Sequence, residues 1–346
     1  MSGRTEGGAA DIGYGRGHMI RPFTYSLIAV ALASLLCASA WVGLRALDRS
    51  YPPPLAEAGL VSTEIVDRDG NLLRAFATPE GRWRLATRIE DVDPKLTRML
   101  IAYEDHRFYS HHGVDIGALF RAAGQLLLNG HIVSGGSTLS MQLARLVEPR
   151  EERSIGAKLI QIVRALQIER RLTKKQILED YLTLAPYGGN LEGVRAASLA
   201  YFGKEPRQLS AAEAATLVAL PQSPERRRPD RAPALAQAAR DRVLIRGLEH
   251  GVIDRPQFER ATSRPAPDRR LALPMQAPHL ATWLAAQSPG TVVPTTMRYE
   301  LQSSLAQLLR DERGQFADGA QIALVAIDNR SGSVVAWLGG DDFFAR

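Results

Sequence analysis

The sequence predicts a mainly α-helical protein with an N-terminal membrane-spanning helix, a small β-hairpin linker and a short α/β segment near its C-terminal end. Three observations support this prediction. Residues 22–44 contain no charged side chain, and apolar residues at helical spacing dominate residues 91–225. Short strand-like runs flank turn residues near positions 70 and 330. With 45% hydrophobic and 23% charged residues, the 346-residue chain has the composition of a globular protein and is long enough for two domains.

The N-terminal region reads as a tail followed by an anchor. Residues 1–21 are glycine-rich and polar and are expected to lie in the cytoplasm, while the uncharged stretch 22–44 is long enough, at about 1.5 Å per residue, to span a bilayer core of roughly 30 Å. Arginines ahead of this stretch place everything after Arg45 outside the cytoplasm. The alternative is a cleaved signal peptide, because Ala38-Ser39-Ala40 resembles a cleavage site. We favour the retained anchor, since the apolar run continues beyond that site.

Charge and cysteine content limit the classes of site. The net charge of +6 suits nucleic acid, anionic lipid and a pyrophosphate equally well. No zinc-type spacing and no nucleic-acid-binding motif accompanies it, so no nucleic-acid partner is expected. Cys37 is the single cysteine, which excludes an internal disulfide and a multi-cysteine metal site.

After the anchor, residues 50–90 are predicted to form a small β-hairpin linker. The signal is an Asp-Gly pair between two short apolar runs, VSTEIV and NLLRAFA. A helical domain is expected over residues 91–280. Its clearest helix start is Ser210, which with Glu213 forms a capping box and opens a helix over Ala211–Leu220.

The pattern changes after residue 291. A helix is predicted at Tyr299–Arg310, followed by two strands around a turn at Asn329–Gly332. Residues 291–346 are therefore expected to be the α/β beginning of a further domain.

The residues that could carry chemistry begin in the segment Tyr103–Asp115, which combines carboxylates, histidines and aromatic side chains. Taken alone, Glu104 fits a surface acid and His111 a buried core histidine. Further segments shift this balance. They are the turn and helix start SGGSTLSMQLAR (Ser134–Arg145), the helix RSIGAKLIQIVRALQIER (Arg153–Arg170), and the closely spaced segments ILEDYLTLAPYGG and AASLAYFGK (Ala196–Lys204). Backbone N–H groups at the start of the first of these helices can face an anion.

Together these five segments resemble, in order and spacing, the motifs of glycosyltransferase family 51, the transglycosylase domain of class A penicillin-binding proteins and of monofunctional peptidoglycan glycosyltransferases. The resemblance covers roughly residues 60–225 and implies a lysozyme-like helical glycosyltransferase domain. It also implies the substrates, which are lipid II (a disaccharide-pentapeptide on undecaprenyl pyrophosphate) and the growing glycan strand. The strand's sugar would be transferred to the 4-hydroxyl of lipid II with inversion and release of undecaprenyl pyrophosphate.

The same resemblance implies that residues 291–346 are a truncated α/β start of a penicillin-binding transpeptidase domain. The sequence contains no Ser-x-x-Lys and no Lys-Thr-Gly motif. We therefore expect neither transpeptidation nor reaction with penicillin from the chain as given.

Residue roles follow from the matching positions. Glu104 is the expected catalytic base, because a neutral sugar hydroxyl must lose its proton in the transition state. Arg145, Arg153 and Lys158 fall where the family places basic residues near the leaving pyrophosphate, which needs charge neutralisation. The residues expected to bind substrate are Asp105, Gly136, Ser137, Thr138, Gln142 and Gln161. Phe108 and His111 are expected to support the loop that carries Glu104.

The sequence departs from the family at several positions. Gln161 stands where the third motif usually ends in a second glutamate, and an amide can hydrogen-bond but cannot accept a proton for catalysis. Because a single displacement with a good leaving group needs no acid partner, we interpret Gln161 as orienting substrate or Lys158. Arg145-Leu146 replaces the usual Lys-Asn, and Thr183 stands where asparagine is common. The apolar segment around Leu126–Leu128 is expected to contact lipid.

No cofactor is expected to be required, and no dedicated metal site is visible, although Mg²⁺ or Mn²⁺ could bridge Glu104 or Asp105 and the pyrophosphate. The expected partners are lipid II, the growing strand, the membrane and other cell-wall synthesis proteins. The expected location is the inner (plasma) membrane, with the catalytic domain on its periplasmic side.

Two alternative functions stay open. The first is a lysozyme-like peptidoglycan hydrolase, which normally needs a second carboxylate. The second is a non-catalytic assembly protein that binds lipid II, for which Gln161 is the supporting feature.

Overall fold

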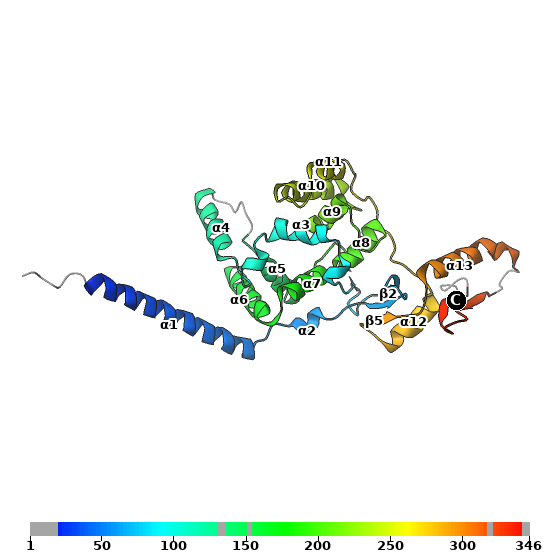
Figure 1. The fold of residues 1–346 in the computed structure, drawn as a ribbon, viewed down its shortest axis with the longest axis horizontal. Coiled ribbons are helices and arrows are strands. Elements are labelled where there is room, and N and C mark those ends of the chain that lie inside the picture. The colour runs from blue at the N-terminus through cyan, green and yellow to red at the C-terminus, as the bar shows by residue number, and fades with distance from the viewer. Residues whose placement is uncertain (1–19, 130–135, 151–153, 317–320, 341–346) are drawn as a thin grey trace, which may run out of the picture. The chain divides into compact units, whose positions relative to one another are not determined.

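The computed structural model describes residues 20–129, 136–150, 154–316 and 321–340 (Figure 1). The chain divides into two compact units, Met1–Pro52 and Pro53–Arg346.

In the first unit, a single helix, α1, runs from Ile20 to Ser50. Its segment Tyr25–Ser50 is long and apolar enough to cross a membrane, and none of it is buried against protein. The helix continues past residue 44, where the predicted anchor ends, to include residues 45–50. One of them, Arg45, places its guanidinium 3.8 Å from the ring centre of Trp41.

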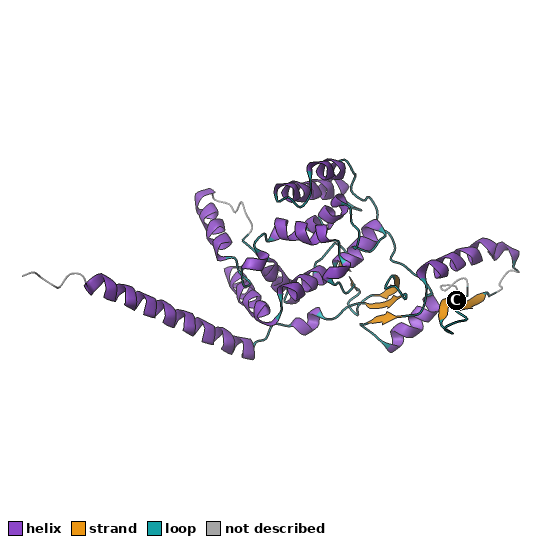
Figure 2. Ribbon diagram, in the orientation of Figure 1, coloured by secondary structure: helices purple, strands orange, loops and turns teal. Residues whose placement is uncertain are grey.

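The second unit is mainly helical, and its described residues also form three small sheets (Figure 2). Its helices are α2 (Leu55–Ala58), α3 (Pro94–Glu104), α4 (Ile116–Asn129), α5 (Leu139–Val147), α6 (Ile155–Arg171), α7 (Lys174–Leu184), α8 (Val194–Phe202), α9 (Ala211–Ala219), α10 (Pro233–Glu249), α11 (Arg255–Thr262), α12 (Pro278–Gln287) and α13 (Tyr299–Asp311). Short 3-10 turns are η1 (Ile89–Asp91), η2 (Phe108–Ser110), η3 (Leu220–Gln222) and η4 (Glu312–Gln315). The strands are β1 (Thr63–Val66), β2 (Leu72–Phe76), β3 (Trp83–Arg84), β4 (Leu191–Glu192), β5 (Val292–Pro294), β6 (Ala323–Ile327) and β7 (Val334–Gly339).

Side-chain caps define where several helices begin. The predicted capping box at Ser210 is confirmed, since its hydroxyl accepts from the N–H of Glu213 and the Glu213 carboxylate accepts from the N–H of Ser210. Thr138 caps α5 and Ser154 caps α6, each through a hydroxyl that accepts from a backbone N–H of the first helical turn. Each such cap satisfies an N–H group that the first helical turn leaves without a partner.

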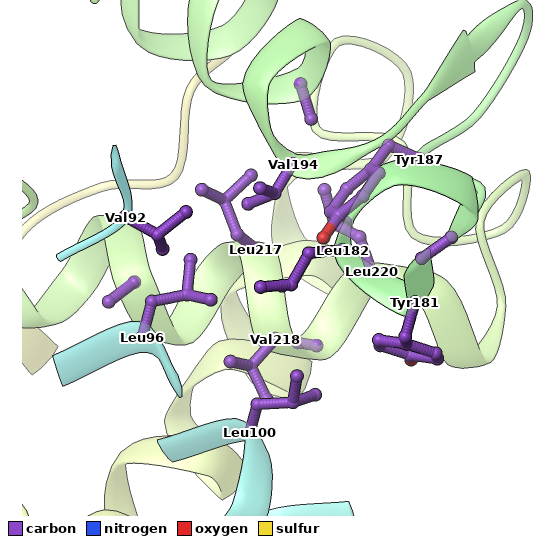
Figure 3. Close-up of a cluster of buried hydrophobic side chains, with 14 of the residues drawn as sticks. Val92, Leu96, Leu100, Tyr181, Leu182, Tyr187, Val194, Leu217, Val218 and Leu220 are labelled. Atoms are coloured by element: carbon purple, nitrogen blue, oxygen red, sulfur yellow. The ribbon is translucent and has the colours of Figure 1, made fainter. Parts of the chain in front are cut away.

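A continuous apolar core joins α3, α7, α8, α9 and α10 (Figure 3). Leu96 and Leu100 of α3 lie in it with Leu217 and Val218 of α9, and all four side chains are almost completely buried. This packing holds α3 firmly, so the position of its last residue, Glu104, is determined by the core.

The predicted hairpin is present, with β1 and β2 antiparallel and Gly70 at a φ of 82° in the turn. The structure adds a third strand that the sequence did not indicate, because β5 pairs with β1 in parallel. Strand β1 is therefore paired along both edges, and all of its residues are buried. Ile65 of β1 packs in a second, smaller apolar cluster with Ala281 of α12.

The predicted elements near the C-terminal end are also confirmed. Helix α13 starts at Tyr299 as expected. Strands β6 and β7 form an antiparallel pair on either side of the predicted turn.

Candidate active site

Glu104 lies at the C-terminal end of α3, and its half-buried carboxylate is held between two amides. Gln142 of α5 donates from Nε2 to Oε2 at 2.7 Å. Gln222 of η3 donates from Nε2 to Oε1, also at 2.7 Å. Each carboxylate oxygen therefore keeps a lone pair for another donor.

Burial raises the pKa of Glu104, and this is the largest influence on it. The two amide hydrogen bonds and the positive charges of Arg227 and Arg145 act in the opposite direction. A carboxylate with a raised pKa is a stronger base, which suits removal of a proton from a hydroxyl group.

Gln142, which the sequence predicts to bind substrate, contacts Glu104 and is itself oriented by another side chain. Its Oε1 accepts a hydrogen bond from the hydroxyl of Tyr181 at 3.3 Å. Burial raises the pKa of Tyr181 well above its ordinary value, so the hydroxyl stays a neutral donor. The Gln142 amide is thereby oriented with its NH₂ group toward Glu104.

Asp105, which the sequence predicts to bind substrate, lines a small pocket beside Glu104 and is also held within the fold. Its carboxylate is buried, accepts from the N–H of Leu139 at 3.0 Å, and lies 3.0 Å from Nε2 of His111 through both oxygens. It therefore ties the Glu104 loop to the start of α5. His111 and the fully buried Phe108 support this loop, as the sequence indicated.

Thr138, likewise predicted to bind substrate, lines the same small pocket. Its hydroxyl caps α5 by accepting from the N–H of Met141 at 3.1 Å, and it donates to the carbonyl of Gly113 at 2.6 Å. Gly113 has a φ of 96°, and a Cβ there would lie 2.9 Å from the carbonyl oxygen of Ala165. Thr138 is thus a buried structural residue, because both of its hydrogen-bonding functions are used within the fold.

Gly136 and Ser137 remain at the surface of the site. Both are half-buried and line a small pocket beside Glu104. The hydroxyl of Ser137 accepts from Nζ of Lys158 at 2.6 Å. This contact links the turn before α5 to the neighbouring helix α6.

A larger pocket of about 520 Å³ lies between α5 and α6. Its polar lining contains Arg145, Lys158 and Gln161, which the sequence predicted, and Glu148, Arg150 and Arg164, which it did not. Arg164 could have been found, since residues 158, 161 and 164 recur at a spacing that shares one helix face. Arg153, also predicted here, lies outside the described residues.

Gln161 orients Lys158 through both ends of its amide. Its Oε1 accepts from Nζ of Lys158 at 3.0 Å, while its Nε2 donates to the carbonyl of Met141 at 2.6 Å. Burial lowers the pKa of Lys158, and the nearby charge of Arg145 lowers it further. Because Gln161 is neutral, it holds the Lys158 amino group without pairing it with a negative charge.

The pocket's cations differ in how they are paired. Glu148 forms ion pairs with Arg164, at 2.6 Å, and with Arg150. Among the described residues, neither Arg145 nor Lys158 is paired with a carboxylate. These two side chains are therefore the ones best able to neutralise an anionic ligand.

The remaining predictions concern Thr183, the apolar segment Leu126–Leu128 and a metal site. Thr183 accepts a hydrogen bond from the N–H of Thr87 at 3.2 Å and so connects α7 to the segment after the hairpin. The side chains of Leu126–Leu128 lie outside the described residues, although their backbone belongs to α4. Within the described part of the chain, no group of three or more His, Cys, Asp or Glu side chains is arranged to hold a metal ion.

The comparisons with known proteins agree with the motif order. The transglycosylase family model matches residues 69–247. Penicillin-binding protein 1C of Escherichia coli (strain K12) is 40% identical over 308 residues, covering 89% of this chain and 39% of that protein. Penicillin-binding protein 1A of Pseudomonas aeruginosa is 35% identical over 263 residues, covering 72% and 32%, respectively. Penicillin-binding protein 1A of E. coli (strain K12) is 32% identical over 307 residues, covering 83% and 35%. The chain thus spans less than half of the length of these curated relatives.

Proposed function

Because this chain belongs to the transglycosylase family, we propose that it is a peptidoglycan glycosyltransferase that polymerises lipid II into glycan strands during cell-wall synthesis. The observation that carries the proposal is the arrangement of the site. A half-buried glutamate at the end of α3 is held by two amides, and α5, which supplies one of these amides, also lines a pocket with two cations that lack a carboxylate partner among the described residues.

In the proposed reaction, Glu104 acts as the general base. Its carboxylate accepts the proton of the acceptor sugar's 4-hydroxyl as that oxygen attacks the anomeric carbon of the strand. The bond to the pyrophosphate breaks in the same step, so the anomeric carbon is inverted and undecaprenyl pyrophosphate leaves. A single displacement of this kind requires no second carboxylate, which is consistent with Gln161.

Arg145 and Lys158 are the proposed contacts of the leaving pyrophosphate. Cations held in place stabilise charge that develops in the transition state without having to reorganise. Gln161 and Ser137 hold the Lys158 ammonium on the pocket side of α6. Arg153 is proposed for the same function on its sequence position alone.

Replacing Lys158 with methionine should lower kcat by about 10- to 1000-fold, since one positioned charge facing the leaving group is lost. The matched control is Lys175→Met, which removes an exposed lysine of α7 that pairs with Glu90. Initial rates of lipid II polymerisation by the full-length protein would measure both. A Lys158→Met rate equal to that of the control would contradict the assignment.

The function itself is tested by incubating the wild-type protein with labelled lipid II in detergent or liposomes. Long glycan strands are the expected product, and adding a chelator to one arm decides whether a divalent cation contributes. Release of soluble muropeptides from finished sacculi would instead support a hydrolase. Binding of lipid II without any polymer would support a non-catalytic assembly protein.

We also propose the cellular setting. Helix α1 would anchor the protein in the inner (plasma) membrane, with the helical domain on the periplasmic side, where it meets a substrate that stays in the bilayer. Other cell-wall synthesis proteins are proposed partners, and no nucleic acid is. Residues 291–346 are proposed to form the beginning of a transpeptidase domain.

A further inference from the structure

The contact between Gln222 and Glu104 links segments that are 118 residues apart and is absent from the motifs described above. Gln222 ends the 3-10 turn η3, which directly follows the buried helix α9. The α9 helix packs against α3, the helix that carries Glu104. The core thus brings this amide to Oε1 of Glu104, the carboxylate oxygen that Gln142 does not contact.

The amide of Gln222 has its orientation set by a cation. Arg227 donates from Nη1 to Oε1 of Gln222 at 3.1 Å, and the same group donates to the carbonyl of Ala219 at 2.6 Å. Because the amide oxygen faces the guanidinium, the NH₂ group must face Glu104. The result is a chain of donors running from Arg227 through Gln222 to Oε1 of Glu104.

Each carboxylate oxygen of Glu104 accepts a hydrogen bond from an amide that is itself oriented by a further side chain, and this further side chain differs between the two. On one side Tyr181 orients Gln142, and on the other Arg227 orients Gln222. The first chain ends in a neutral hydroxyl and the second in a positive charge. Only the second can therefore favour the ionised form of Glu104 through its terminal charge as well as through its hydrogen bond.

We infer that Gln222, oriented by Arg227, is a positioning residue of glycosyl transfer that holds Oε1 of Glu104 and keeps this carboxylate ionised and correctly aimed at the acceptor hydroxyl. This inference rests on the proposed function. Gln222 acts through Glu104, so it contributes to the rate of the chemical step and not to the binding of lipid II.

The charged and titratable groups around Glu104 set the expected pH response. They come from several elements, namely Tyr103 of α3, Arg145 of α5, Tyr181 of α7, Arg227 after η3, and Asp105, His106, Asp115 and Arg121 of the neighbouring small pocket. Of these, Arg227 and Arg145 lower the pKa of Glu104, as does the amide of Gln222. Loss of the amide therefore raises this pKa, and the base becomes ionised only at a higher pH.

The experiment measures kcat and KM for lipid II across pH with full-length wild type and Gln222→Leu. Because Gln222 is exposed, the substitution should leave the fold intact. We expect kcat to fall about 10- to 100-fold near neutral pH, the scale of a lost hydrogen bond to a charged group. KM should stay unchanged, and the acid limb of the kcat profile should move to higher pH, so that the deficit shrinks as the pH rises.

The matched control is Arg226→Met, which removes an exposed charge from the same loop and should retain wild-type kcat and the wild-type pH profile. The double variant Gln222→Leu/Arg227→Met tests the chain of donors. The single variant Arg227→Met completes the cycle. Because part of the effect of Arg227 passes through Gln222, the loss of kcat in the double variant should be smaller than the product of the two single losses, while the direct charge of Arg227 on Glu104 keeps it larger than the loss in Gln222→Leu alone. If the two single losses multiply in full, the proposed chain is overturned.

Failure of this inference is distinguishable from failure of the proposed function. If wild type polymerises lipid II and Glu104→Gln does not, but Gln222→Leu has an unchanged kcat and acid limb, the positioning role is wrong and the function stands. A lowered melting temperature with unchanged kinetics would assign Gln222 a structural role only and would also overturn it. Absence of polymerisation by wild type would remove the basis of both.

Discussion

Replacing Glu104 with glutamine is expected to lower the rate of lipid II polymerisation by about 10²- to 10⁴-fold, the usual contribution of a general base. The substitution keeps the size and hydrogen-bonding shape of the side chain but removes its ability to accept a proton. Burial and the amides of Gln142 and Gln222 act on this carboxylate together. No other carboxylate contacts these two amides among the described residues.

Initial rates with labelled lipid II, together with lipid II binding, would check this expectation. Binding should survive, because the pyrophosphate contacts on α5 and α6 are unchanged. The matched control is Glu259→Gln, which alters an exposed glutamate of α11 that pairs with Arg255. Polymerisation by Glu104→Gln at the control's rate would show that another group is the base.

Replacing Arg195 with methionine is expected to destabilise the second unit by about 3–5 kcal/mol, because it leaves a buried charge without its partner. Arg195 of α8 donates to Oε2 of Glu64 at 2.7 Å and forms two bonds of 2.9 Å to the carboxylate of Glu205. Glu64 belongs to β1 and has no exposed surface. This contact therefore fastens the hairpin to the helical domain from inside the protein.

Thermal unfolding of the full-length protein would measure the loss, expected as a lower Tm on the order of 10 °C. Arg246→Met is the matched control, since it removes an exposed arginine whose pair with Glu249 contributes little. The double variant Glu64→Met/Arg195→Met should recover much of the stability, because no buried charge is then left alone at β1. A Tm of Arg195→Met equal to that of the control would contradict the assigned role.

The pH dependence of this loss has a defined direction. Burial raises the pKa of Glu64, and the Arg195 charge opposes that effect. Without Arg195 the pKa in the folded state rises further above its value in the unfolded chain, so the folded state binds the extra proton. Stability then increases as the pH falls through the raised pKa. The deficit of the variant should consequently be smaller in mildly acidic buffer than at neutral pH.

Much of the fold could be predicted because its signals are local. An uncharged run long enough to cross a bilayer, an Asp-Gly turn between apolar runs, and the capping box at Ser210 each depend on a few neighbouring residues. The structure has helix α1, the hairpin and helix α9 at these positions. Strand β5 was missed because three residues carry no periodic pattern and its partner β1 lies far away in the chain.

The site could be predicted only to the level of its segments. The motif order located Glu104, Arg145, Lys158 and Gln161, and the structure brings the last three to one pocket. The motif order did not show that the Asp105 side chain points inward and contacts α5 and His111, because consecutive residues at a helix end can face opposite directions.

The sequence by itself determined the membrane-spanning candidate, the helical domain, the family and the identity of the proposed base, since these depend on local pattern and on motif order. Only the tertiary structure decided which side chains surround that base. Gln222 reaches Glu104 because α9 packs on α3, and Lys158 faces the pocket because α5 supplies a carbonyl for Gln161. Such contacts depend on packing between distant segments, and no local pattern of residues records them.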